Sequence, residues 1–228
     1  MLSVPEFSEI VGDIYESALE PSRWQHVVVR LCEVFRGIRA DMVIVDGLKG
    51  NFELQLHHNY PQSLVEGLNR DFLLNPLSPL VLVHPLGDPL LSDETYGLAE
   101  LKKSLYFQRN LQNIDVVDVM VLPLARKMTR GAMINISRGA AVGPFDQADS
   151  DVARLFLPHL QRAIDISGLL KRGADAEASL EAMLATMSAA AWIVAPDGTI
   201  LHANEAAGAE AARGALLRVA DDRLTAAL

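Results

Sequence analysis

The chain has 228 residues, of which 50% are hydrophobic and 21% are charged, and its formal net charge is −9. This is ordinary composition for a globular protein with one large domain or two modest ones. The negative charge excludes nucleic-acid binding by this chain alone, because phosphate backbones require a basic surface. No segment approaches the ~20 apolar residues of a membrane span, and residues 1–10 lack the features of a secretory signal, so we expect a cytoplasmic protein.

Two helices are predicted at the start of the chain. Apolar residues recur at helical spacing over residues 7–18 and again over residues 24–35. Pro21 precedes the second stretch, where proline suits the first helical turn. Cys32, the only cysteine, lies among apolar residues of this second helix, so we expect a buried and unreactive thiol.

Two β-hairpins follow, separated by helical segments. Residues 42–57 contain a β-branched run, a turn and an alternating stretch, and residues 116–136 repeat that pattern. Between them, Leu64, Leu68 and Phe72 predict a helix that ends before Pro76. Four prolines over residues 76–92 exclude a long helix there, and a helix resumes near Asp93.

Helices before, between and after two hairpins predict an α+β fold, an antiparallel sheet flanked by helices. Such an arrangement leaves a cavity between sheet and helices, which is a natural small-molecule site.

A long helix is predicted from Asp146, which suits the N-cap, with Asp149 and Asp151 at the positive end of the helix dipole. Pro158 is expected to bend or locally break it, and a second amphipathic stretch follows Gly173. Its apolar stripe either packs on the protein's own sheet or forms the seam of a homodimer. The dimer residues would be Phe156, Leu160, Ala163 and Leu170.

The tail has a pattern of its own. Residues 191–194 and 199–202 predict two short strands around the tight turn Pro196-Asp197-Gly198, and Asn204 is placed to cap an alanine-rich helix. Residues 191–207 resemble the opening of a PAS module. The resemblance implies three parts: a sensor domain over 1–145, long signalling and dimerisation helices over 146–188, and an incomplete PAS-like module over 189–228.

No catalytic signature is present, since the chain has no glycine-rich phosphate loop, no nucleophile elbow and no zinc-binding helix motif. His57 and His58 are adjacent on a predicted strand, where their side chains would point to opposite faces and make a poor chelate. His159 suits a hydrogen-bonded or exposed position better than a haem ligand. We therefore expect no catalytic residue, no metal and no cofactor.

Several segments resemble the N-terminal halves of LuxR-type helix-turn-helix transcription regulators. The residues that carry this resemblance are Gly143-Pro144-Phe145-Asp146, Leu155-Phe156-Leu157-Pro158-His159-Leu160, residues 15–24 and residues 104–107. The resemblance implies a GAF-like or PAS-like sensor domain at the N-terminus and DNA binding through a C-terminal domain that is absent from this chain.

Residues 59–68 are similar to the acyl-homoserine-lactone-binding stretch of quorum-sensing members of that family. Tyr60 matches, whereas Leu64 stands in place of a tryptophan, Leu68 in place of a tyrosine, and Asn75 in place of an aspartate. Leucine cannot hydrogen-bond to a polar ligand head, so the resemblance argues against a standard lactone. The expected apolar pocket residues are Tyr60, Leu64, Leu68, Phe72, Asn75 and Tyr106, which could equally fill a solid core.

These observations favour the ligand-sensing, homodimeric region of a LuxR-type regulator that responds to an apolar small molecule. Two alternatives remain open. The same sensor modules could serve a kinase or cyclase, or the chain could be a small enzyme, which a cleft with strongly shifted pKa values would support.

Overall fold

The computed structural model describes residues 2–46, 49–128, 130–213, 217–220 and 223–226. The chain divides into two compact units, Met1–Ser167 and Gly168–Leu228, which are described separately below. The division that we predicted after residues 145 and 188 stays a prediction.

The first unit is built on a five-stranded antiparallel sheet with strand order β2-β1-β5-β4-β3. The strands are β1 (Arg39–Asp46), β2 (Asn51–His58), β3 (Leu90–Leu91), β4 (Asp118–Lys127) and β5 (Arg130–Arg138). The two predicted hairpins are β1–β2 and β4–β5, and β1 pairs with β5 to join them at the centre of the sheet. The α+β class and the helix-flanked antiparallel sheet are therefore confirmed.

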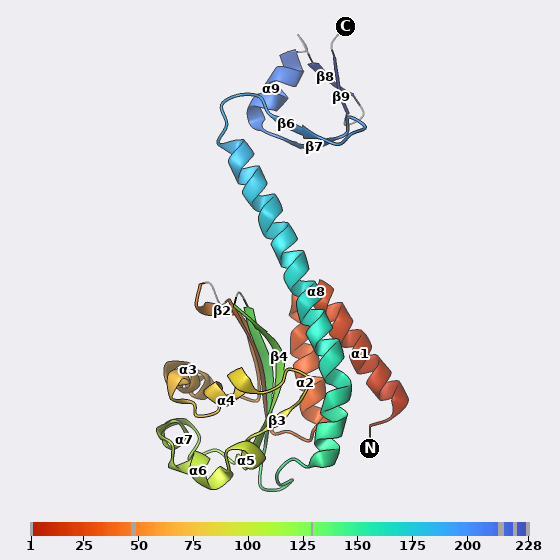
Figure 1. Ribbon diagram of the computed structural model, residues 1–228. Helices are drawn as coiled ribbons and strands as arrows, with labels where there is room; N and C mark the ends of the chain where they lie inside the picture. Colours follow the sequence, from red (N-terminus) through yellow and green to blue (C-terminus); the bar gives the residue numbers. More distant parts are fainter. Residues whose placement is uncertain (1, 47–48, 129, 214–216, 221–222, 227–228) are drawn as a thin grey trace. The chain divides into compact units, whose positions relative to one another are not determined.

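One face of this sheet carries the hydrophobic core, which α1 (Val4–Leu19), the short 3₁₀ turn η1 (Pro21–Arg23), α2 (Trp24–Val34) and the first part of α8 (Gln147–Ala185) cover (Figure 1). Ala40, Met42 and Ile44 point to this face, because side chains alternate along a strand. Cys32 is buried here as expected. Burial and the nearby charge of Glu33 raise the pKa of its thiol to about 11.

The opposite face is covered by short helical pieces instead of long helices (Figure 1). They are α3 (Gln62–Arg70), the 3₁₀ turn η2 (Phe72–Leu74), α4 (Ser78–Val83), α5 (Ser92–Thr95), α6 (Leu98–Lys103) and α7 (Leu105–Asn110). Pro79 lies in the first turn of α4, as a proline must if the helix is to form. Gly97, at a φ of 87°, separates α5 from α6.

Helix α8 runs without interruption from Gln147 to Ala185, so of the two effects expected of Pro158, a bend or a local break, the break does not occur. Its N-terminus is capped as predicted. The Asp149 amide donates to Oδ1 of Asp146 at 2.9 Å, and the Asp146 amide donates back to Oδ2 of Asp149 at 3.0 Å.

The predicted dimer stripe on α8 is largely inside the protein's own core. Phe156, Leu160 and Ala163 have no exposed surface and pack on the sheet side of the helix. A homodimer seam through these three side chains is therefore wrong, because their apolar surface is already buried. Leu170, which is 51% exposed, is the one predicted dimer residue that remains on the surface.

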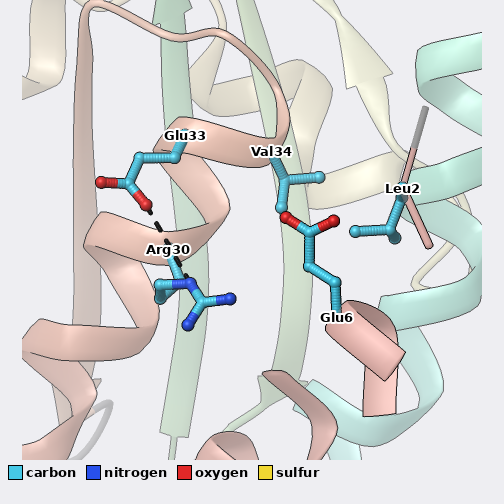
Figure 2. Close-up of a pocket in the computed structure, with 5 residues that line it drawn as sticks. All are labelled: Leu2, Glu6, Arg30, Glu33 and Val34. Atoms are coloured by element: carbon cyan, nitrogen blue, oxygen red, sulfur yellow. Dashed lines mark ion pairs between the residues drawn. The ribbon is translucent and has the colours of Figure 1, made fainter. Parts of the chain in front are cut away.

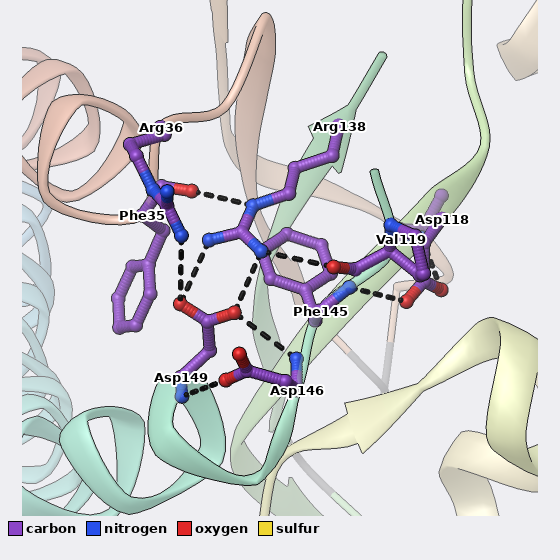
Figure 3. A network of polar contacts seen from close by, with 9 residues as sticks. Phe35, Arg36, Asp118, Val119, Arg138, Phe145, Asp146 and Asp149 are labelled. Atoms are coloured by element: carbon purple, nitrogen blue, oxygen red, sulfur yellow. Dashed lines mark hydrogen bonds and ion pairs between the residues drawn. The ribbon is translucent and has the colours of Figure 1, made fainter. Parts of the chain in front are cut away.

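The buried side chain of Arg138, the last residue of β5, connects the sheet to the start of α8 (Figure 3). The Arg138 guanidinium, 1% exposed, donates to both carboxylate oxygens of Asp149, at 2.6 and 2.7 Å. It also donates to the carbonyls of Phe35, at 2.8 Å, and Pro144, at 3.1 Å, and lies 4.1 Å from the Phe145 ring centroid. One side chain thus connects the end of α2, strand β5 and helix α8.

This ion pair affects the Asp149 carboxyl in a definite direction. Burial alone would raise its pKa, but hydrogen bonds from Arg138 and the Asp146 amide, and the charges of Arg138 and Arg36, outweigh burial and lower it. The pair therefore stabilises the fold above the ordinary carboxyl pKa, and this contribution is lost as the pH falls through the lowered value.

The second unit contains the remainder of α8 and two hairpins around one helix. The elements are β6 (Trp192–Val194), β7 (Ile200–Ala203), α9 (Glu205–Arg213), β8 (Leu217–Ala220) and β9 (Arg223–Ala226). The predicted strand–turn–strand and capped helix are confirmed, since Oδ1 of Asn204 accepts from the Ala207 amide at 2.9 Å. The Asn204 side chain also donates to the carbonyls of Leu184, Met187 and Ala189, which fixes the end of α8 against this hairpin.

We expect Arg138→Met to lower the free energy of unfolding of the first unit by ~3–5 kcal/mol, because it leaves a partly buried carboxylate without its cation. Urea unfolding can be followed by the fluorescence of the buried Trp24, with Trp192 replaced by phenylalanine. Arg23→Met is the matched control. Its exposed ion pair with Glu16 is worth ~0–1 kcal/mol. Equal effects of the two substitutions would contradict the role given to Arg138.

Candidate ligand pocket

The second face of the sheet carries a row of polar side chains across three neighbouring strands. Asp41 on β1 lies opposite His57 on β2 and opposite Asn135 on β5. Directly paired residues point to the same face of a sheet, so these three side chains stand side by side on the face away from the core.

A cavity of about 580 Å³ lies over this row, between the sheet and the short helical pieces. Most of its wall is apolar, with aliphatic side chains from the strands below and from α3, α4 and the segment before β4. Asp41, His57, Asn135 and Ser137 line it from the sheet, and Tyr60, Asn75 and Tyr106 add polar groups from the cover. An apolar chamber with a few convergent polar groups is the usual form of a small-molecule site.

The structure places all six predicted pocket residues on the wall of this one cavity. Tyr60 follows β2, Leu64 and Leu68 lie on α3, and Phe72 lies in η2. Asn75 precedes α4, and Tyr106 comes from α7. That they contact a ligand stays a proposal.

Sequence reasoning missed the polar row itself. Asp41, His57 and Asn135 belong to strands whose register brings them together, and the strand was predicted to begin only at Met42. A signal did exist, since Arg39, Asp41 and Val43 alternate with the apolar Ala40 and Met42. An aspartate inside such an alternating strand marks a face that is not the core.

Asp41 is a buried carboxylate that accepts hydrogen bonds from neutral donors. The Tyr60 hydroxyl donates to its Oδ1 at 2.8 Å, and the Asn135 amide donates to its Oδ2 at 2.7 Å. Burial raises the pKa of Asp41, and these two hydrogen bonds and the nearby His57 offset only part of that rise. Burial and the Asp41 charge also raise the pKa values of Tyr60 and Tyr106, so both phenols stay neutral.

His57 stands beside this carboxylate as a neutral imidazole. Burial lowers the pKa of His57, although the charge of Asp41 acts in the opposite direction. Both ring nitrogens are buried without a hydrogen-bond partner among the described residues, and the ring centroid lies 5.2 Å from that of Tyr60. Buried polar atoms that lack partners are expensive, which makes His57 a candidate for pairing with a ligand.

Polar contacts hold the short helices that cover the cavity, α3 to α7, at two places. Asp71, at the end of α3, accepts hydrogen bonds from Arg109 and Asn110 of α7. Gly67 permits this close packing, because a Cβ there would lie 2.3 Å from Oδ1 of Asn110. The guanidinium of Arg126, on β4, donates to three carbonyl groups at the end of α4, namely those of Val81, Leu82 and His84.

A second hollow, of about 190 Å³, lies on the surface between α1 and α2 (Figure 2). Leu2, Glu6, Arg30, Glu33 and Val34 line it, and Arg30 forms ion pairs with Glu33, at 4.0 Å, and with Glu9, at 3.9 Å. Arg30 is thus already paired, and the Glu6 carboxylate accepts from the Ser3 amide. It offers a ligand neither enclosure nor a free polar group.

Other kinds of site find no support in the part of the chain that the structure describes. There, no three His, Cys, Asp or Glu side chains gather closely enough to hold a metal ion. Within the same residues, no helix combines the length and the apolar character needed to cross a bilayer.

No protein-family profile matches the chain, and no curated protein sequence matches it either. Among solved structures, the chain is similar to the ligand-binding domain of VqsR from Pseudomonas aeruginosa. The sequence identity is 11%, the TM-score is 0.53, and the match covers 71% of this chain and 95% of that one.

Two further structures align with lower TM-scores. The LuxR-family, N-acylhomoserine-lactone-dependent transcription factor CepR2 from Burkholderia cenocepacia has 10% identity and a TM-score of 0.48, over 68% of this chain and 90% of that one. The GAF domain of a phosphoenolpyruvate-protein phosphotransferase from Coxiella burnetii has 15% identity and a TM-score of 0.44, over 73% and 95%. The similarity to VqsR shows that the first unit shares the fold of that ligand-binding domain, as the sequence resemblance implied.

Asp41 gives the pocket a testable pH dependence. Its raised pKa means that, above the ordinary value of 3.8, the folded protein holds more protons than the unfolded chain, so the free energy of unfolding falls as the pH rises. Asp41→Asn cannot titrate. The difference in free energy of unfolding, variant minus wild type, should therefore increase with pH and then level off above the folded-state pKa.

Urea titrations from about pH 4 to about pH 8 measure this difference. Both proteins should carry His57→Gln, because the lowered pKa of His57 produces a pH dependence of the opposite sign. A difference that stays constant across the range would show that Asp41 titrates normally.

Proposed function

We propose that the first unit senses an amphipathic small molecule, which it binds in the 580 Å³ cavity between the sheet and α3 to α7, as the sensor region of a LuxR-type transcription regulator. The observation that carries this proposal is the cavity itself, which is mostly apolar and has a row of polar side chains, His57, Asp41 and Asn135, across its sheet wall. The likeness of the fold to the VqsR ligand-binding domain supports it.

The size and lining of the cavity suit this role. Small-molecule sites commonly enclose ~300–1,000 Å³, and their apolar walls supply affinity while a few polar groups set orientation. A ligand that filled this cavity would bury the apolar side chains of α3 and of strands β1, β4 and β5. Its polar head would meet the row formed by His57, Asp41 and Asn135.

A standard lactone signal does not suit the chemistry of these walls. Leu64 offers no donor where quorum-sensing relatives have a tryptophan. The side-chain oxygen of Asn75, in place of their aspartate, already accepts from the Leu77 amide at 3.0 Å. The row of His57, Asp41 and Asn135 on the sheet offers polar partners of another kind, so we propose a ligand of a different head-group chemistry.

We further propose that the parent protein couples this unit to a helix-turn-helix DNA-binding domain. The support is the set of LuxR-type motifs around Phe145 and Leu160, since a chain with a net charge of −9 lacks a basic surface of its own. Reading the gene beyond the codon for Leu228 tests this directly, because a kinase or cyclase domain there would replace the DNA-binding output.

An enzyme is the second candidate, and one observation favours it. Asp41, His57, Tyr60 and Tyr106 have shifted pKa values and line one cavity, as catalytic groups often do. However, both oxygens of Asp41 are engaged by Tyr60 and Asn135, and both phenols are held neutral. Mass spectrometry of a ligand recovered after long incubation separates the candidates, because a sensor returns it unchanged.

The pocket predicts saturable binding of the neutral fluorescent probe N-phenyl-1-naphthylamine, whose emission rises in apolar surroundings. Leu68→Trp places a larger side chain on the cavity wall and should weaken this binding by roughly tenfold or more, which corresponds to about 1.4 kcal/mol. Fluorescence titration measures the dissociation constant of each protein.

Leu155→Trp, at an exposed position of α8, is the matched control and should bind the probe as the wild type does. Absence of saturable binding to the wild type, or equal binding to Leu68→Trp, would reject the proposed pocket.

We also propose that the chain forms a homodimer through the exposed apolar residues of α8 beyond Ser167, namely Leu169, Leu170 and Met183. Leu170→Glu should then raise the dimer dissociation constant by about tenfold or more, because it puts a charge into an apolar interface. Light scattering coupled to size-exclusion chromatography measures this, with Leu155→Glu as the exposed control. A wild type that is monomeric at every concentration would refute it.

A further inference from the structure

The cavity contains a buried carboxyl group, that of Asp41, which forms no ion pair with a basic side chain among the described residues. Asp41 is the only acidic residue among the described residues that line the cavity, and it is 8% exposed. Its hydrogen-bond donors, Tyr60 and Asn135, are neutral, and His57 beside it is held neutral by burial. Tyr106, which faces it from α7, is neutral as well.

Arg39 is the other charged residue on the cavity wall, and it does not pair with Asp41. It lies two residues earlier on β1, where its Nε donates to the Asn59 carbonyl at 3.1 Å. No ion pair joins its guanidinium to Asp41 within the described residues, and Nη1 of Arg39 is buried without a partner there. The Asp41 carboxylate and the Arg39 guanidinium are therefore two separate polar groups on one wall of the cavity.

Buried charges in proteins are normally paired, because removing an ion from water without a counter-ion costs several kcal/mol. Arg138 and Asp149 follow this rule in the same protein, with two hydrogen bonds between opposite charges. Asp41 breaks it. Each of its oxygens accepts one hydrogen bond from a side chain, and a carboxylate oxygen can accept a second.

We propose that the ligand of this cavity is an amine, whose ammonium group pairs with Asp41 while an apolar chain or ring fills the space against α3. This inference rests on the proposed function and adds the head-group chemistry. A ligand ammonium supplies both the missing positive charge and a charge-assisted hydrogen bond. A neutral alcohol supplies a hydrogen bond alone, and a carboxylate head meets a like charge.

Three probes that share an eight-carbon chain test this order of preference: n-octylamine, 1-octanol and octanoate. Each is titrated, below its micelle-forming concentration, into the wild-type protein loaded with N-phenyl-1-naphthylamine. We expect octylamine to displace the fluorescent probe at a concentration about tenfold or more below that of octanol, with octanoate the weakest.

Variants at position 41 show whether the carboxylate causes the preference. Asp41→Asn should bring octylamine to the level of octanol while binding of N-phenyl-1-naphthylamine is retained, which also reports that the variant is folded. Asp41→Glu keeps the charge and should keep the preference for the amine. Glu66→Gln removes a charge from α3 outside the cavity and should leave all three displacement curves unchanged.

The outcomes separate the two proposals. If N-phenyl-1-naphthylamine does not bind, the pocket itself fails, and the amine proposal fails with it. If the probe binds but octanoate displaces it as well as octylamine does, the amine proposal alone is overturned, and Arg39 becomes the recognition group. Retention of the amine preference in Asp41→Asn overturns it equally.

Discussion

The strict alternation of side chains along β1 and β5 divides the first unit into two chemically different halves. Ala40, Met42 and Ile44 point toward α1, α2 and α8 and belong to the hydrophobic core. Asp41 and Val43 point the opposite way, toward the cavity. A shift of one residue in strand register would move a carboxylate into the core and leave the apolar set facing the cavity, so the register of this sheet decides both stability and binding chemistry.

Two carboxylates of the first unit, Asp149 and Asp41, lie in contrasting settings, and the contrast separates structure from recognition. Asp149 receives two hydrogen bonds from Arg138, and its pKa is lowered. Asp41 receives two hydrogen bonds from neutral groups, and its pKa is raised. The first arrangement holds elements together and is complete without a ligand. The second leaves a charge for which the protein supplies no counter-ion, on the wall of a chamber large enough for a small molecule.

The helices that cover the two faces of the sheet differ in length for a physical reason. Long helices with continuous apolar stripes exclude water from the core face. On the cavity face, prolines and Gly97 limit the helices to a few turns, and their packing relies on polar ties such as those of Asp71 and Arg126. Short pieces cannot fill the space above a flat sheet as a continuous helix does, and a chamber is left between them. Movement of this cover, with its exposed Leu73 and Leu82, would give a ligand access to the cavity.

Local patterns in the sequence were sufficient for most of the secondary structure. Alternation predicted both hairpins, helical spacing predicted α1, α2 and α3, and Asp146 and Asn204 were recognised as caps, because each of these features depends on residues close together in the chain. The sequence pattern did not predict that α8 continues through Pro158. A proline weakens a helix locally, but the burial of Phe156 and Leu160 against the sheet stabilises this helix from outside. Resemblance to known regulators, which draws on long-range information, supplied the six residues that line the cavity.

The sequence by itself therefore determined the α+β class, the order of the elements and an apolar wall centred on Leu64, Leu68 and Phe72. Only the tertiary structure decided where the polar groups stand. His57, Asp41 and Asn135 are far apart in the chain, and they meet because β1 pairs with β2 on one side and with β5 on the other. It also decided that Phe156, Leu160 and Ala163 serve the core and not a partner, since a helical stripe has the same spacing whichever surface it packs against.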